Sequence, residues 1–172
     1  MIKSWKKKIE LNKYHCVSEI QLKIFTGGII MSDTIFTTSV KATGGREGRV
    51  ESEDYVIQFD TAMPGTPRAK ELEDATNPEQ LFAAGYAACF DGALQLMAER
   101  QKVKFASEVT ASVSLMKDPA DQGFKIGVTL TVKGTDIEKG ILEDLVHKAH
   151  NFCPYSKATR GNIDVKLEVV TA

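Results

Sequence analysis

One segment of this 172-residue chain limits its fold more than any other, and that segment is a long apolar helix. Residues 76–79 read Thr-Asn-Pro-Glu, which predicts a helix start with a capping residue, a proline in the first turn and a Thr-x-x-Glu capping box. Residues 81–90 follow as Leu-Phe-Ala-Ala-Gly-Tyr-Ala-Ala-Cys-Phe, and the helix is expected to continue to about Arg100. Because this run is apolar on nearly every face, it predicts a helix that is buried in a core.

The rest of the chain predicts strands and one further helix. A second helix, amphipathic, is expected after residues 135–136 and should end before Pro154, since a residue that precedes proline is pushed out of helical space. Residues 62–75 are expected to form a surface loop. Strands are predicted at residues 34–40, 49–52, 55–60, 109–115, 124–132 and 163–169. The order β-β-β-α-β-β-α-β indicates an α+β fold with antiparallel sheet, because the strands come mostly in hairpin-like groups.

Composition is that of a single globular domain, with 42% apolar and 26% charged residues. A net charge of −1 gives no reason to expect nucleic acid or an anionic membrane as a partner. The chain has no stretch of 18 or more apolar residues, so the sequence predicts no transmembrane helix. The three cysteines, Cys16, Cys89 and Cys153, are too few and too far apart for a secreted disulfide framework. We therefore expect a soluble, cytoplasmic protein.

Residues 1–30 differ from the rest of the chain in charge. They hold six lysines and two acidic residues, a net charge of +4 against −5 for the remainder, which together give the −1 of the whole chain. The segment has no arginine and no uninterrupted apolar core, so it fits neither a mitochondrial transit peptide nor a secretory signal. Residues 31–33 are typical of a bacterial protein start. We expect residues 1–30 to be a non-native or disordered extension, with a functional extension as the alternative, and residues 31–172 to form one domain.

Two cysteines are candidates for redox chemistry. Cys89 lies in the predicted buried helix, where a packed core thiol is the plain alternative. A reactive role requires a base or a cation that lowers its pKa, because only the thiolate is nucleophilic. Cys153 precedes Pro154, which places a second thiol at a corner between elements. Whether the two sulfurs meet depends wholly on the fold.

Other polar side chains offer further candidates. Arg46 lies in a glycine-rich turn from which a guanidinium can project, and Glu79 sits at the third position of the helix, where capping is its plain role. His147, His150 and Cys153 have the spacing His-x-x-His-x-x-Cys of possible zinc ligands. Because the first and last of these diverge around a helix, we expect no metal there and polar-face roles for the histidines.

Three motifs resemble one protein family. Residues 75–90, ATNPEQLFAAGYAACF, resemble the peroxidatic-cysteine helix of the organic hydroperoxide resistance (Ohr) branch of the OsmC/Ohr family. Residues 152–165 resemble the second-cysteine segment of that branch, and residues 44–49 resemble its arginine turn. The motifs occur in the family's order, and the resemblance covers about residues 34–170. The loop at residues 62–74 departs from the glycine-rich family loop.

The resemblance implies an OsmC/Ohr-like α+β fold and an intertwined homodimer, in which antiparallel sheets surround two long central helices. It also implies a thiol peroxidase that reduces organic and lipid hydroperoxides to alcohols in the response to oxidative stress. Cys89 would form a sulfenic acid, and Cys153 would resolve it as a Cys89–Cys153 disulfide. No cofactor would be bound, and the dihydrolipoyl dithiol of a lipoylated protein would be the external reductant.

The resemblance also supplies the cation that Cys89 requires. Arg46 would face Cys89 and lower the pKa of its thiol, and Glu79 would hold the guanidinium by a bidentate contact. An apolar wall that includes Leu81 and Phe82 would favour bulky organic hydroperoxides. The alternatives are a peroxidase of the sister OsmC-type branch, and a non-enzymatic dimeric binding domain in which both cysteines are structural.

Overall fold

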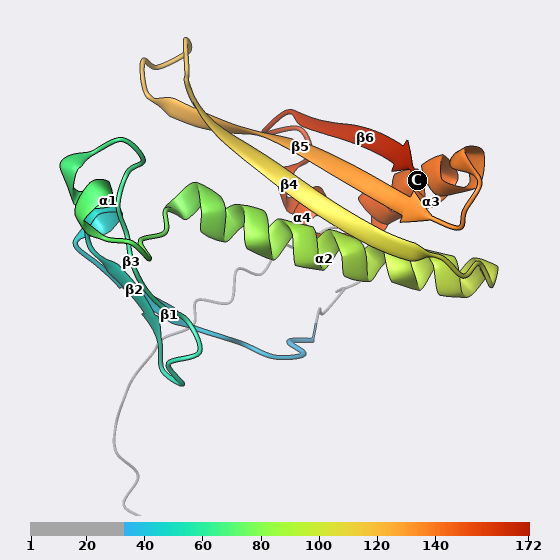
Figure 1. The fold of residues 1–172 in the computed structure, drawn as a ribbon, viewed down its shortest axis with the longest axis horizontal. Coiled ribbons are helices and arrows are strands. Elements are labelled where there is room, and N and C mark those ends of the chain that lie inside the picture. The colour runs from blue at the N-terminus through green and yellow to red at the C-terminus, as the bar shows by residue number, and fades with distance from the viewer. Residues whose placement is uncertain (1–32) are drawn as a thin grey trace, which may run out of the picture. The chain divides into compact units, whose positions relative to one another are not determined.

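The computed structural model describes residues 33–172 (Figure 1). These residues divide into a segment that ends at Thr38 and a compact unit, Ser39–Ala172. The predicted extension, residues 1–30, lies outside the described residues. The compact unit contains helices and two three-stranded sheets, which confirms the predicted α+β class.

Helix α2, Pro78–Gln101, is the predicted long helix. Its N-cap is Asn77, whose Oδ1 accepts a hydrogen bond from the backbone N–H of Gln80 at 2.8 Å. The predicted capping box of Thr76 and Glu79 is therefore wrong. Thr76 is still extended, because it forms an isolated parallel bridge with Thr61. As a consequence, the Glu79 carboxylate is free to bind another group.

Only one face of α2 is buried within the chain. The buried side chains are those of Tyr86, Phe90, Ala93, Leu94, Met97 and Ala98, and this face packs on β4 and α3. Ala84, Ala88 and Gly92 are exposed. The predicted burial is thus confirmed for one side of the helix. By length and composition alone α2 is apolar enough to cross a membrane, a test that the core helices of soluble proteins also pass.

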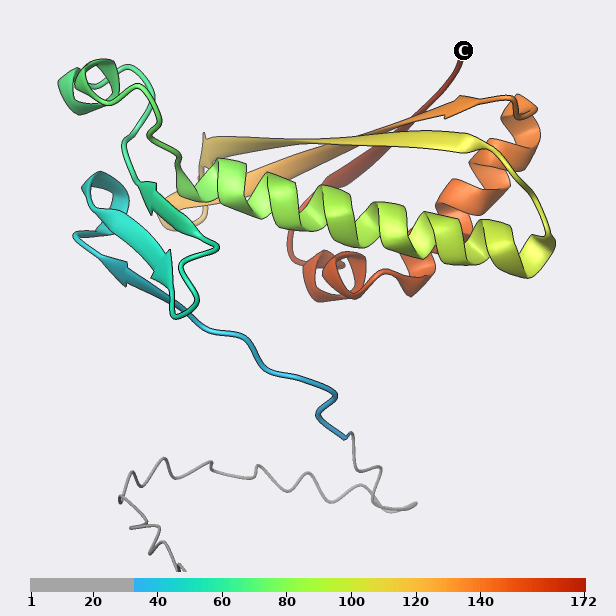
Figure 2. The same cartoon turned by 60° about the horizontal axis from the view of Figure 1, so that its bottom comes forward.

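The second sheet contains β4 (Ala106–Lys117), β5 (Phe124–Thr135) and β6 (Val165–Thr171). β4 and β5 form the predicted antiparallel hairpin. β6 lies parallel to β5, so the expectation of purely antiparallel sheets is wrong for this pair. The reason is the helical connection from β5 to β6, which returns the chain to the end from which β5 started. Figures 1 and 2 show the helices of this connection and α2 on the same face of the sheet.

Two helices form that connection, α3 (Lys139–Phe152) and α4 (Pro154–Thr159). α3 is amphipathic as predicted, and its buried side chains are Leu142, Leu145, Val146 and Ala149. It ends before Pro154 as predicted. Pro154 then begins α4, because proline is well suited to the first position of a helix. The core lies between these helices, α2 and the inner side chains of β5 such as Leu130 and Val132.

The first sheet is an antiparallel meander of β1 (Val40–Thr43), β2 (Arg49–Ser52) and β3 (Gln58–Asp60). A 3₁₀ turn, η1 (Gly45–Glu47), joins β1 to β2. Residues 34–39 are not a strand, because the pairing of β1 with β2 begins only at Val40. Residues 55–57 belong to a turn in which Tyr55 has φ 58°, so β3 is shorter than predicted.

Two further features of this region matter for the site. A short helix, α1 (Pro67–Glu71), interrupts the predicted loop and is capped by Thr66. The large apolar side chains Val40, Val56 and Phe59 of the first sheet and its turn are exposed. Within one chain this sheet therefore does not bury an apolar face.

Candidate active site

The fold brings two thiols together from elements far apart in the sequence. Cys89 lies in the middle of α2, and Cys153 lies at the junction between α3 and α4. The thiol of Cys153 donates to the sulfur of Cys89 at an Sγ–Sγ distance of 3.5 Å. Both thiols are free. Since a disulfide bond is about 2.05 Å long, a small shift of either side chain would allow the bond to form.

The corner between α3 and α4 sets the position of Cys153. Its backbone N–H donates to the carbonyl of Ala149 in the last turn of α3, and its own carbonyl accepts from the N–H of Lys157 in α4. The next residue is Pro154, whose ring fixes the backbone at the start of α4. The Cys153 side chain is fully buried, whereas that of Cys89 is only partly buried. Cys89 is therefore the thiol that a substrate can reach.

The surroundings of Cys89 within one chain favour the neutral thiol. Burial raises the pKa of Cys89, and the backbone N–H of Tyr155, which bonds the sulfur, opposes that rise. The neighbouring Cys153 thiol raises the pKa of Cys89 further. A nucleophilic Cys89 thus requires a positive charge in addition to the groups that surround it here.

Arg46 and Glu79 form the bidentate pair that the resemblance implies. The guanidinium Nη1 and Nη2 donate to the two carboxylate oxygens at 2.9 Å and 2.6 Å. The Glu79 side chain is 15% exposed and that of Arg46 is 42% exposed. The hydrogen bond from Arg46 lowers the pKa of Glu79, so the carboxylate stays ionised in mildly acidic solution.

The turn that carries Arg46 depends on its glycines. Gly44 and Gly45 both have positive φ, at 72° and 62°, a region that residues with a Cβ rarely adopt. The hydroxyl of Thr61 accepts from the N–H of Gly48 at 3.0 Å and donates to the carbonyl of Gly45 at 3.0 Å. These bonds tie the turn that carries Arg46 to the chain after β3.

The four predicted catalytic residues form two separate pairs within one chain. Glu79 precedes Cys89 by ten residues on α2, which corresponds to about 15 Å along the helix axis. Within residues 33–172, no hydrogen bond or ion pair joins Arg46 to either cysteine. Within one chain Arg46 therefore does not reach Cys89, because its guanidinium is bound to Glu79. That Arg46 faces Cys89 across a dimer interface stays a prediction.

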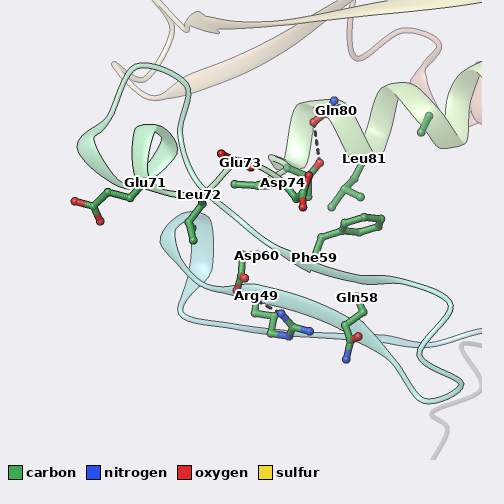
Figure 3. A pocket seen from close by; sticks show the side chains of 13 residues that line it. Arg49, Gln58, Phe59, Asp60, Glu71, Leu72, Glu73, Asp74, Gln80 and Leu81 are labelled. Atoms are coloured by element: carbon green, nitrogen blue, oxygen red, sulfur yellow. Dashed lines mark hydrogen bonds and ion pairs between the residues drawn. The ribbon is translucent and has the colours of Figure 1, made fainter.

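Two cavities lie near the Arg46–Glu79 pair. One, of about 430 Å³, is lined by that pair and by apolar side chains that include Val113 and Leu115 of β4. The other, of about 840 Å³, is drawn in Figure 3, where Leu81 lies beside the ring of Phe59. Leu81 lines this second cavity, as do several acidic side chains of residues 71–74.

The second predicted substrate residue, Phe82, has a different environment from Leu81. Its ring packs edge-on against Tyr86, with the ring centroids 5.8 Å apart, and lies 5.9 Å from the ring of Tyr155. These three rings, two from α2 and one from α4, pack together beside the turns of α2 that precede Cys89. Phe82 therefore belongs to an apolar cluster with two tyrosines that the sequence motifs did not single out. That Leu81 and Phe82 bind substrate stays a prediction.

These two tyrosines link α2, which carries Cys89, to α4, which follows Cys153. Tyr155 supplies the backbone N–H at Cys89. Its hydroxyl packs close to Gly85, since a Cβ added to Gly85 would lie only 2.8 Å from the hydroxyl oxygen. Tyr86 hydrogen-bonds to α4. The pattern of the helix offered one indication, since Gly85 is a small residue within an apolar run and marks a close approach by another group.

The histidines do not complete a metal site with Cys153. Among residues 33–172, no three His, Cys, Asp or Glu side chains are arranged to hold a metal ion. His147 is exposed, and the ring of His150 lies 6.5 Å from that of Phe90. Burial is the largest cause that lowers the pKa of His150, followed by the charges of Arg160 and His147.

The fold and the two facing thiols show that the chain is an α+β protein with a dithiol site on its long helix, α2. Residues 69–168 match the model of the family described as OsmC-like protein. The chain is 68% identical over 139 residues to the organic hydroperoxide resistance protein OhrA of Bacillus subtilis (strain 168), which covers 81% of this chain and 99% of the relative. The chain therefore belongs to the OsmC-like family and, within it, to the organic hydroperoxide resistance type.

Solved structures agree with this placement. The crystal structure of the organic hydroperoxide resistance protein OhrB of Bacillus subtilis matches with a TM-score of 0.75 and 55% identity, over 79% of this chain and 99% of that one. An organic hydroperoxide resistance protein from Legionella pneumophila matches with a TM-score of 0.71 and 48% identity, over 80% of this chain and 99% of that one. The predicted OsmC/Ohr-like fold is confirmed.

Proposed function

We propose that the chain is a thiol peroxidase that reduces organic hydroperoxides to alcohols. The observation that carries this proposal is the 3.5 Å distance between the sulfurs of Cys89 and Cys153. Cys89 is partly exposed and Cys153 is buried. This is the arrangement that an attacking thiol and a resolving thiol require. The names of the relatives support organic hydroperoxides as the substrate class.

The reaction proceeds in three steps. The Cys89 thiolate attacks one peroxide oxygen, the O–O bond breaks, and the alkoxide leaves and takes up a proton to become the alcohol. Cys89 is then a sulfenic acid. The Cys153 sulfur attacks the Cys89 sulfur, the S–O bond breaks, and hydroxide leaves with the thiol proton as water. An external dithiol finally reduces the disulfide by exchange and returns both thiols.

A second copy of the chain completes the site in this proposal. Cys89 requires a cation, yet Arg46 of the same chain is bound to Glu79, a residue about 15 Å from Cys89 along the axis of α2. The exposed small residues of α2, Ala84, Ala88 and Gly92, allow a second helix to approach closely. The first sheet also leaves apolar side chains uncovered. A homodimer would bury both surfaces and would bring the partner's Arg46 to Cys89, where it would lower the pKa of the thiol.

The apolar wall beside Cys89 supports a preference for organic over hydrogen peroxide. Burial of an alkyl group against rings such as Phe82 is favourable, by roughly 25 cal/mol for each Å² of apolar surface removed from water. Hydrogen peroxide has no such surface. The cavity beside the Arg46–Glu79 pair, with Val113 and Leu115, is a second apolar region that a long acyl chain can occupy.

The chemistry of the Cys89–Cys153 dithiol supports a particular reductant and a particular cell compartment. A free dithiol that cycles through a disulfide is suited to a reducing compartment, which favours the cytoplasm. A dihydrolipoyl group on a partner protein has two thiols on one short chain and can release the mixed disulfide internally. The cycle needs only thiols, and we propose that it runs without a bound metal or cofactor.

Cumene hydroperoxide consumption with dihydrolipoamide as reductant tests the assignment. The Cys89→Ser variant should lose turnover, because the nucleophile is gone. Cys16→Ser, which changes a cysteine outside the described residues, is the matched control and should retain full turnover. If Cys89→Ser consumes the hydroperoxide at the wild-type rate, the assignment is wrong.

A mixture of two inactive variants tests the shared site. In a heterodimer of Cys89→Ser and Arg46→Ala chains, one site combines an intact Cys89 with the partner's intact Arg46. After unfolding and refolding at equal amounts, random pairing should restore about a quarter of wild-type activity if each site uses both chains. A site built within one chain would leave the mixture as inactive as either variant alone.

A further inference from the structure

A buried tyrosine lies one helical turn before Cys89 and is used by none of the steps above. Tyr86 is fully buried in the core, three residues before Cys89 on α2. Its hydroxyl oxygen lies 3.0 Å from the Ser156 hydroxyl and 3.3 Å from the Thr159 hydroxyl. Both partners are buried side chains of α4. A buried hydroxyl is costly unless it is hydrogen-bonded, so this cluster favours one placement of α4 against α2.

Helix α4 and its N-cap carry two groups that hydrogen-bond to the Cys89 sulfur. Cys153 is its N-cap, and Tyr155 in its first turn supplies the backbone N–H. Among residues 33–172, and apart from the thiol–thiol contact, the bonds from Tyr86 are the hydrogen bonds that join a side chain of α2 to a side chain of α4. The remaining contacts between these helices include aromatic packing of Tyr86 and Phe82 on Tyr155.

We propose that Tyr86 is a positioning residue for disulfide closure, and that its hydroxyl holds α4 so that Cys153 stays within reach of Cys89. In this step the Cys153 sulfur bonds to the sulfenic Cys89 sulfur, and the hydroxyl of the sulfenic acid leaves with the thiol proton as water. The Cys89 sulfur is reduced and the Cys153 sulfur is oxidised, so no further reagent is required. The consequence for peroxide turnover rests on the proposed function.

The position of Cys153 matters because closure competes with a second oxidation. A sulfenic acid that meets another hydroperoxide becomes a sulfinic acid, which thiols do not reduce. A misplacement of reacting atoms by about 1 Å can slow a reaction about a hundredfold. We therefore expect closure at least about tenfold slower once the Tyr86 hydroxyl is removed, whereas the first attack of Cys89 on hydroperoxide should keep its rate.

A thiol–disulfide equilibrium tests the placement without any peroxide. In a Cys16→Ser background, the protein is equilibrated with mixtures of reduced and oxidised glutathione, and the effective concentration of the Cys89–Cys153 pair is measured. Tyr86→Phe should lower this effective concentration about tenfold, because it removes the hydroxyl and keeps the ring. Tyr55→Phe makes the same chemical change at an exposed turn and should leave the value unchanged.

A second measurement follows the peroxide reaction. With excess cumene hydroperoxide and no reductant, the sulfinic form of Cys89 should reach about tenfold greater abundance relative to the disulfide in Tyr86→Phe than in wild type. If the wild-type thiols do not react with hydroperoxide at all, the proposed function fails. The glutathione equilibrium then still decides the role of Tyr86.

A third variant makes the test independent of how well Tyr86→Phe folds. Ser156→Ala removes one partner of the hydroxyl on the opposite side, and thermal unfolding shows which variants are folded. Ser156→Ala should also lower the effective concentration, and the double variant should lower it by less than the product of the two single effects. Unchanged or higher effective concentrations in the folded variants would overturn the proposal.

Discussion

The Arg46–Glu79 pair gives a prediction for both stability and activity. Glu79→Gln keeps the shape of the side chain and removes the charge that receives two hydrogen bonds, at 2.6 Å and 2.9 Å. Hydrogen bonds to charged groups contribute about 1.5–3 kcal/mol when well buried. Because Arg46 is 42% exposed, solvent screens part of this value, and we expect a loss of about 1 kcal/mol in the free energy of unfolding at pH 7.

The pH dependence of this loss follows from the lowered pKa of Glu79. An unfolded glutamate titrates near pH 4.3, and Arg46 lowers the pKa of Glu79 in the folded chain. The stability contributed by this ionisation is present above the unfolded pKa and is lost as the pH falls through the lower folded pKa. The difference between wild type and Glu79→Gln should thus be constant from pH 6 to 8 and should shrink below about pH 4.

Urea unfolding followed by circular dichroism measures this difference across pH. Glu143→Gln is the matched control, since it removes a carboxylate from an exposed helix pair with Lys139 and should change little. Activity should fall about tenfold in Glu79→Gln, because Arg46 loses the group that fixes its direction. A Glu79→Gln protein with wild-type stability and activity at pH 7, or with a loss that persists at pH 3, would refute this reasoning.

Three further outcomes are expected. Gly85→Ala places a Cβ 2.8 Å from the Tyr155 hydroxyl, so the overlap should outweigh the gain of about 1 kcal/mol in helix propensity, and urea unfolding should show a net loss of stability. Leu94→Ala truncates a fully buried side chain and should lower the free energy of unfolding by about 2–5 kcal/mol, measured in the same way. Arg46→Ala should raise the pKa of Cys89 in the proposed dimer, seen as slower iodoacetamide alkylation at neutral pH and an unchanged rate at high pH.

The elements that the sequence predicts well are those whose pattern is local. The apolar run of α2 and the alternation of β4 and β5 depend only on side chains a few residues apart, and both elements are found where expected. The direction of β6 was not predictable in this way. Alternation is the same for a parallel and an antiparallel neighbour, and the parallel pairing follows from how α3 and α4 return the chain.

Tertiary contacts decided the features that were predicted wrongly. Thr76 and Asn77 are both suitable N-cap residues for α2. Asn77 is the N-cap, because Thr76 is extended and pairs with Thr61 in a β-bridge. Residues 34–39 have strand-forming side chains, but among residues 33–172 no strand pairs with them, since β1 and β2 pair only from Val40 onward.

For the candidate site, too, the sequence predicts residues that lie in local motifs but not the contacts between distant elements. The resemblance of three motifs predicted Cys89, Cys153, Arg46 and Glu79, and the structure brings them together as two pairs. Spacing alone could not show that the two thiols meet, because their contact depends on the packing of α4 against α2. The same packing explains why Tyr86 was missed, since a tyrosine in an apolar helix predicts only a core position.

The most direct test of the dithiol cycle is a thiol count with a single addition of substrate. The chain has three cysteines, and one equivalent of cumene hydroperoxide per chain should reduce the count of free thiols from three to one. Mass spectrometry of the digested protein should show a disulfide between the peptides of Cys89 and Cys153. A count that stays at three, or a disulfide that involves Cys16, would contradict the proposed cycle.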